Sequence, residues 1–91
     1  MDLGERFGDW LAASQRLAPG TVAAYTADAR AFSAFLGRAG KAPAEAAIGD
    51  VAAWAAARQL GGAEARTLAK ANSALRSLFR FMVDEGLAGA N

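Results

Sequence analysis

The apolar positions of this sequence recur at intervals of three and four residues along most of its length. The longest such stripe consists of Val22, Tyr25, Ala29, Phe32 and Leu36. This spacing places the side chains on one face of a helix. Pro19 suits the first turn of that helix, because its missing N–H would have no intrahelical partner there. We therefore predict a helix that begins at Pro19 and ends near Gly37, where a glycine-marked break follows.

The same helix carries a second stripe of small residues, which consists of Ala24, Ala27, Ala31 and Ala34. We expect another backbone to approach closely along this stripe. A preceding helix is predicted over about residues 2–14, although Gly4 and Gly8 weaken it. Its apolar side is made of Leu3, Phe7, Trp10 and Leu11.

Two more helices are predicted after the glycine break. The third is short, from about Asp50 to Arg58, and offers Val51 and Trp54 to a core. The fourth runs from about Ala65 to Glu85 and separates its faces cleanly at 100° per residue. Its apolar arc contains Leu68, Ala71, Leu75, Leu78, Phe79 and Met82. Its opposite side carries Arg66, Lys70, Ser73, Ser77 and Arg80, with Arg76 on the flank.

Composition points to one all-α domain over residues 1–91. Alanine, a strong helix former, accounts for 26 residues, and β-branched residues are scarce. The chain has no cysteine and no histidine, so we expect no disulfide, no metal site and no cofactor. No apolar run approaches a membrane span, and no signal peptide is apparent, so we expect a cytoplasmic protein without a membrane partner.

The net charge of +1 conceals an uneven distribution. Residues 65–83 contain four cations and no acid. A helix face with cations and short hydroxyls suits a duplex groove, because cations displace counterions from phosphates and arginine can contact guanine. A charged outer face is also the ordinary surface of any amphipathic helix. Charge therefore leaves three classes open: a DNA-binding module, a protein-interaction module, and a purely structural bundle.

The order of motifs resembles the core-binding domain of the tyrosine recombinases, of phage-integrase or Xer type. The fourth helix contains the run Ser73-Ala74-Leu75-Arg76-Ser77-Leu78-Phe79, which leads to Asp84-Glu85-Gly86 and Asn91. The second helix contains Pro19-Gly20-Thr21, followed by Tyr25 and Asp28 at the family's spacing. The interval between these motifs, with Ile48-Gly49-Asp50-Val51, also fits, so the resemblance covers essentially the whole chain.

The resemblance implies a four-helix, SAM-like orthogonal bundle that forms half of a C-shaped clamp on DNA during site-specific recombination or integration. Implied partners are double-stranded DNA, the C-terminal catalytic domain of the same parent protein, and recombinase protomers in a synaptic tetramer. Tyr25 is expected to pack at the bundle edge with its hydroxyl hydrogen-bonded there, the alternative being a contact with a phosphate. The implied DNA-binding residues lie on the second and fourth helices: Thr21, Ala24, Arg66, Thr67, Lys70, Ser73 and Ser77, with Arg76 and Arg80 as backbone contacts.

Several positions depart from the family pattern. Ala18 and Glu64 stand where serine-like helix caps are usual, so both DNA-facing helices are expected to start without a good cap. Ala23, Thr26 and Ala27 occupy positions that relatives often fill with arginine, so the second helix is expected to grip phosphates weakly. Asn72 replaces an apolar residue, and we expect it either to contact DNA or to hydrogen-bond along the helix.

The chain is not expected to be an enzyme by itself. The family's tyrosine nucleophile, arginines, lysine and histidines belong to a catalytic domain absent from residues 1–91. The competing hypothesis is a helical protein–protein interaction module. On that hypothesis the first helix, with Trp10 and Phe7, is the better candidate for contacts between subunits.

Overall fold

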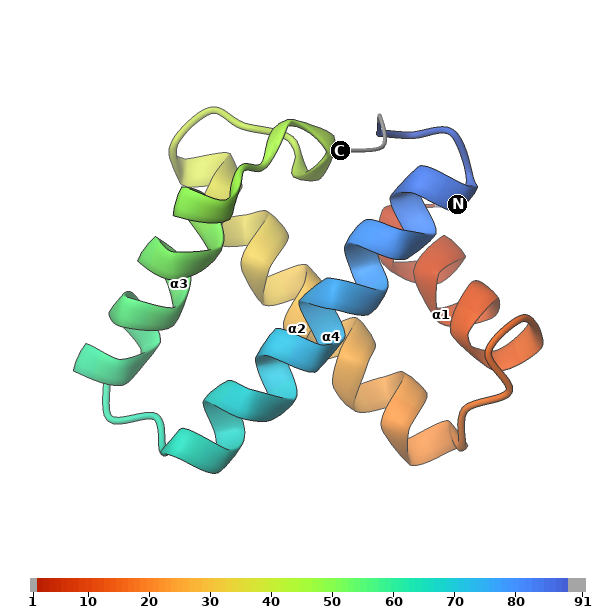
Figure 1. The fold of residues 1–91 in the computed structure, drawn as a ribbon, viewed down its shortest axis with the longest axis horizontal. Coiled ribbons are helices and arrows are strands. Elements are labelled where there is room, and N and C mark those ends of the chain that lie inside the picture. Colours follow the sequence, from red (N-terminus) through yellow and green to blue (C-terminus); the bar gives the residue numbers. More distant parts are fainter. Residues whose placement is uncertain (1, 89–91) are drawn as a thin grey trace.

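Helices account for about three quarters of the described part of the chain, residues 2–88 of a computed structural model, and no strand occurs there (Figure 1). The elements in chain order are α1 (Leu3–Ala13), α2 (Pro19–Arg38), the short 3-10 helix η1 (Pro43–Glu45), α3 (Ile48–Leu60) and α4 (Ala65–Asp84). The predicted all-α class with four helices is confirmed. Asn91, which the family pattern places at the end of its last motif, lies outside the described residues.

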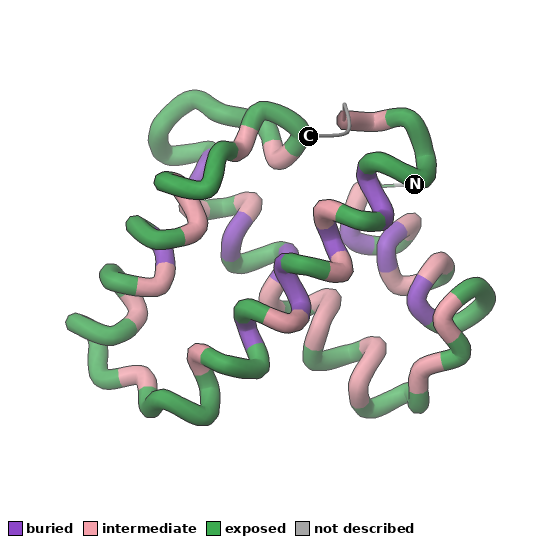
Figure 2. Tube along the Cα trace, in the orientation of Figure 1, coloured by how far each residue is buried: buried purple, intermediate pink, exposed green. Residues whose placement is uncertain are grey.

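The two longest helices, α2 and α4, cross in the middle of the molecule, with α1 on one side and α3 on the other (Figure 1). All four contribute buried residues, which recur at intervals along each helix (Figure 2). α4 contributes more of them than any other helix. Its predicted apolar arc includes four of its buried residues but misses Ala74 and Phe81. The buried hydrophobic residues are Phe7, Leu11, Ala29, Phe32, Leu36, Trp54, Ala71, Ala74, Leu75, Leu78, Phe81 and Met82.

Two aromatic clusters lie on the two sides of this crossing. On the α1 side, the Phe81 ring lies 5.5 Å from Phe7 and 5.6 Å from Trp10, measured between ring centroids. On the α3 side, the Phe32 ring lies 5.5 Å from Trp54, in an edge-to-face arrangement with an interplanar angle of 66°. These separations are typical of stabilising aromatic pairs. Trp54 is the one buried residue of α3, so it is the main anchor of that helix.

The sequence predicts the wrong surface for close helix packing. The four residues of the stripe, Ala24, Ala27, Ala31 and Ala34, are all exposed. The close approach instead uses the two glycines of α1. A methyl group at Gly4 would collide with the Arg30 guanidinium, and one at Gly8 would lie 3.3 Å from Thr26 Oγ1. These glycines lower helix propensity, yet they let α1 pack tightly on α2.

The helix starts agree with the predicted capping. Asp2 caps α1, where its Oδ1 accepts a hydrogen bond of 2.8 Å from Glu5 N. This bond, helped by Arg30, holds the pKa of the Asp2 carboxyl below its ordinary value. Neither Ala18 at the start of α2 nor Glu64 at the start of α4 makes a side-chain cap. The prediction that both starts are weakly capped is confirmed.

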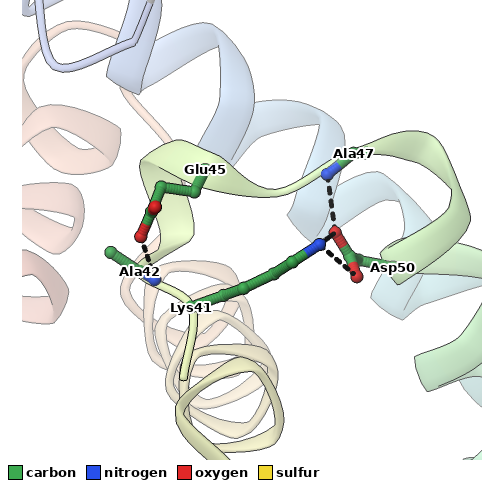
Figure 3. A network of polar contacts seen from close by, with 5 residues as sticks. All are labelled: Lys41, Ala42, Glu45, Ala47 and Asp50. Atoms are coloured by element: carbon green, nitrogen blue, oxygen red, sulfur yellow. Dashed lines mark hydrogen bonds and ion pairs between the residues drawn. The ribbon is translucent and has the colours of Figure 1, made fainter. Parts of the chain in front are cut away.

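The third helix begins two residues earlier than predicted, because Asp50 lies in its first turn rather than at its start (Figure 3). Asp50 Oδ2 accepts a hydrogen bond of 2.8 Å from Ala47 N, and it forms an ion pair with Lys41 Nζ at 3.0 Å. The backbone bond first, and Lys41 second, lower the pKa of Asp50. Glu45 Oε1 accepts from Ala42 N at 2.8 Å, so acidic side chains order the connection from α2 to α3.

No helix within residues 2–88 combines the length and the apolarity that a membrane span requires. The same residues contain no group of three acidic side chains close enough to hold a metal ion.

Candidate nucleic-acid interface

A groove of about 410 Å³ runs between the N-terminal halves of α2 and α4. From α2 it is lined by Gly20, Thr21, Ala24, Tyr25 and Asp28, and from α4 by Thr67 and Lys70. The structure thus brings together four of the residues that the family resemblance nominates, although they lie more than forty positions apart in the sequence. Tyr25 is half-buried against the core, as expected, but its hydroxyl makes no hydrogen bond to the described residues.

The outward face of α4 continues from this groove toward the C-terminal end of the helix. Arg66 and Arg80 are exposed there, and Ser73 and Ser77 are half-buried between them. This arrangement agrees with the polar face predicted from helical periodicity. The face offers three cations, counting Lys70, and two hydroxyl groups on one side of a single helix. Their role in binding a ligand stays a prediction.

Arg76 lies in a different place. It lines a second groove, of about 460 Å³, between α3 and α4. Asn72 lines the same groove, and no hydrogen bond from its side chain occurs within the described residues. The remaining lining is apolar and consists of Ile48, Val51, Ala52, Ala55, Leu75 and Phe79. The structure therefore separates Arg76 from the groove that holds Lys70 and Thr67.

The cations of the molecule divide by whether they have an acidic partner. Outside α4, four of the six cations form ion pairs among the described residues: Arg6 with Glu85 at 3.8 Å, Arg30 with Asp2 at 3.4 Å, Lys41 with Asp50 at 3.0 Å, and Arg58 with Asp28 at 3.1 Å. On α4, none of the four cations is paired with an acid of residues 2–88. All four are exposed. An anion that approached α4 would thus meet charges without an internal partner.

Sequence reasoning missed the pair formed by Asp28 and Arg58. Asp28 appears in the sequence only as part of the family pattern, and Arg58 only as a cation favoured at a helix end. Thirty positions separate them, and no local pattern joins residues at that distance. In the structure, Arg58 also stacks on Trp54, with its guanidinium carbon 4.8 Å from the ring centroid. The pair brings α3 to the edge of the α2–α4 groove.

The expectation that Phe7 contributes to contacts between subunits is wrong. Its side chain is fully buried against Phe81 and Trp10. Trp10 is half-buried and lines a shallow hollow with Arg6 and Glu85, so it presents only part of its ring to solvent. Thr26 lies on the α1 side of α2: its hydroxyl oxygen is close to Gly8 of α1, and it does not line the groove.

Comparison with known proteins agrees with this architecture. A family model described as "Phage integrase, N-terminal SAM-like domain" matches residues 5–86. The chain is 42% identical over 86 residues to the tyrosine recombinase XerC of Mesorhizobium japonicum, covering 88% of this chain and 28% of the relative. It is 37% identical over 83 residues to the tyrosine recombinase XerD of Bradyrhizobium diazoefficiens, covering 91% of this chain and 26% of the relative.

A third relative, the tyrosine recombinase XerC of Methylobacterium nodulans, is 40% identical over 93 residues, with 93% of this chain and 29% of the relative covered. The chain thus spans less than a third of the length of these relatives. No solved structure gives a significant match. The family model covers most of the chain, and its helical fold agrees with the four helices described above. The chain therefore belongs to the family of phage integrase N-terminal SAM-like domains.

Proposed function

We propose that this chain binds duplex DNA as the N-terminal domain of a tyrosine recombinase, through the α2–α4 groove and the outward face of α4. The observation that carries the proposal is that all four cations of α4 are exposed and lack acidic partners among the described residues. Cations already engaged by carboxylates would have to give up those partners before they could neutralise a phosphate. The α4 cations are free to displace counterions from the duplex directly.

The groove has the chemistry of a phosphate-binding site. Lys70 supplies a point charge with three donors, and the hydroxyls of Thr21 and Thr67 are donors of a length suited to phosphate oxygens. Ala24, without a long side chain, leaves room for the sugar–phosphate backbone to approach α2. Contacts of this kind fix the orientation of a protein on DNA without reading its sequence.

The outward face of α4 is the part that would lie along the major groove. Ser73 and Ser77 can reach phosphates or base edges, and Arg66 and Arg80 can reach phosphates or make a two-pronged contact with guanine. Arg76 lines the α3–α4 groove, so we expect it to contribute less to DNA binding than the sequence pattern implies. The proposed DNA-binding set is therefore Thr21, Ala24, Arg66, Thr67, Lys70, Ser73, Ser77 and Arg80, with Arg76 at its margin.

The chemistry of recombination is assigned to a different part of a longer parent protein. The relatives are named tyrosine recombinases, and this chain matches less than a third of their length. On this proposal the chain's partners are double-stranded DNA, the catalytic domain of the same parent, and other protomers of a synaptic assembly. The chain would form one half of a clamp that closes on the recombination site.

A second candidate function, protein–protein interaction, is favoured by one observation. The α3–α4 groove is largely apolar, and Ile48 at its edge is 89% exposed. An apolar groove of this kind fits an amphipathic segment of another protein. The two functions use different surfaces, so a substitution in one surface separates them.

The test is a fluorescence-anisotropy titration of the chain into a labelled duplex of random sequence, at low salt and at physiological salt. We expect a Kd in the range of about 10⁻⁴ to 10⁻⁶ M at physiological salt, typical of non-specific contacts. Lys70→Glu is expected to weaken binding about tenfold. Arg38→Glu is the matched control, because it reverses the same charge about 25 Å along α2 from Thr21. Equal losses in both variants would contradict the proposed site.

A further inference from the structure

Asp28 is the one carboxylate in the lining of the α2–α4 groove, where it shares the space with Lys70. A carboxylate in this position threatens the proposed function in two ways. It would repel an incoming phosphate, and it could pair with Lys70 and remove that charge from the ligand. In the structure Lys70 has no acidic partner among residues 2–88, and Asp28 is paired with Arg58.

The engagement comes from α3. Arg58 Nη1 donates a hydrogen bond of 3.1 Å to Asp28 Oδ1, and both side chains are about three-quarters buried, at 27% and 22% exposed. The guanidinium also lies over the Trp54 ring, with its carbon 4.8 Å from the ring centroid. Trp54 is itself packed against Phe32 in the core. A planar guanidinium can stack on an aromatic ring and bind a carboxylate at the same time. Arg58 is therefore held in place by Trp54 and Asp28 before any ligand arrives.

We propose that Arg58 is a positioning residue of the DNA groove: by holding Asp28, it cancels the negative charge there and keeps Lys70 available to phosphate. Arg58 itself does not touch the DNA in this account. The inference rests on the proposed function, and it adds a residue of α3 to a site otherwise built from α2 and α4.

The proposal makes the two members of one ion pair affect DNA binding in opposite directions. Arg58→Met keeps most of the side chain that covers Trp54 but leaves Asp28 without a partner, so we expect DNA binding about three- to tenfold weaker. Asp28→Asn removes the carboxylate, so we expect binding unchanged or up to about threefold tighter. The double variant Asp28→Asn/Arg58→Met is expected to bind within about twofold of the unmodified chain.

A purely structural pair would behave differently, because breaking it from either side loosens the same contact between α2 and α3. Both single variants would then weaken binding, and that result would overturn the proposal. So would a double variant as weak as Arg58→Met alone, because it would show that Arg58 contacts the DNA itself. Circular dichroism of each variant confirms that the helices are retained.

Two further variants keep the test decisive. Should Arg58→Met fail to fold, Arg58→Lys takes its place: it retains the charge beside Asp28, and affinity within about twofold of the unmodified chain is expected, whereas a tenfold loss would overturn the proposal. The exposed pair Arg6–Glu85, far from the groove lining, is the matched control. Arg6→Met changes the net charge by the same amount as Arg58→Met, and Glu85→Gln by the same amount as Asp28→Asn. Each control variant is expected to shift affinity by less than twofold.

The same titrations separate this inference from the proposed function. If the unmodified chain does not bind duplex, or if Lys70→Glu binds as well as the unmodified chain, then the proposed function is wrong. If Lys70→Glu weakens binding while Asp28→Asn and Arg58→Met shift affinity in the same direction, the DNA site stands and only the role of Arg58 is wrong.

Discussion

The cations on α4 and most of the cations elsewhere in the described chain differ in what they contact. Arg6, Arg30, Lys41 and Arg58 each reach an acid from another part of the chain and so connect one element to the next. The α4 cations make no such connection within residues 2–88, although they belong to the longest run of positive charge in the sequence. The paired cations connect elements of the bundle. The cations of α4 remain available to a ligand.

The difference shows why net charge describes this domain poorly. At +1 overall, the chain gives little reason to expect an affinity for DNA. Pairing removes most of the charge of α1, α2 and α3 from consideration and leaves α4 as a local cationic surface. Surface ion pairs contribute little to stability, but here they also decide which cations remain available. The following predictions break or sharpen this contrast, from the largest expected effect to the smallest.

The largest effect, on the free energy of unfolding, is expected from removing Trp54, the residue that anchors α3 and the paired cation Arg58. Trp54→Ala deletes the one buried side chain of α3 and the surface on which Arg58 stacks. We expect a loss of about 3–5 kcal/mol in the free energy of unfolding, measured by urea denaturation followed by circular dichroism. Trp10→Ala is the comparison variant. Because Trp10 is only half-buried, its loss should be smaller but measurable, and an unchanged Tm would show that Trp10 does not pack on Phe81.

Next in size is the loss of the unpaired charges. The double variant Arg66→Glu/Lys70→Glu is expected to weaken duplex binding by about 100-fold, because two cations at the proposed contact surface become anions. Both side chains are exposed and unpaired within the described residues, so Tm should stay nearly constant. The measurement pairs an anisotropy titration with a thermal melt. Retained DNA affinity would show that the wrong face of α4 has been chosen.

A smaller effect separates contact cations from structural ones by their salt dependence. Four to six phosphate contacts give a log–log slope of affinity against salt of about −4 to −5. Lys70→Ala is expected to reduce the magnitude of this slope by about 1. Lys41→Ala removes the same charge from the α2–α3 connection and should leave the slope unchanged. Identical slopes for the two variants would mean that only total charge matters.

The smallest effect concerns the paired region alone. The pKa of Asp50 is lowered by the bond from Ala47 N and by Lys41, so its ionised form stabilises the fold. That contribution is present above the ordinary value of 3.8 and is lost as the pH falls through the lowered pKa. Asp50→Asn should therefore lower Tm at neutral pH, and the difference from the unmodified chain should shrink in acid. A difference that persisted at low pH would assign the effect to something other than the charge.

The sequence alone predicts the helices and their buried faces well. Periodicity identifies the core stripes of α2 and α4, and the missing caps at Ala18 and Glu64 are visible as residue types. The cationic face of α4 is also predictable, because helical geometry relates residues that are close along the chain. All of these are local properties.

Relations between helices could not be predicted in the same way. The choice between the alanine stripe of α2 and the glycines of α1 as a packing surface depends on which helices meet. The placement of Arg76 on the α3 side, and not beside Lys70, depends on the direction in which α3 returns. The pair of Asp28 with Arg58 joins two helices across thirty positions. In each case the deciding contact comes from tertiary structure, which periodicity does not contain.

The central claim, that DNA lies on the α2–α4 groove and the outward face of α4, is tested most directly by amide chemical-shift mapping of the labelled chain during titration with duplex DNA. We expect the shifted amides to cluster at Thr21–Asp28 and Arg66–Ser77. Shifts concentrated on Ile48–Leu60 of α3, or on α1, would contradict it.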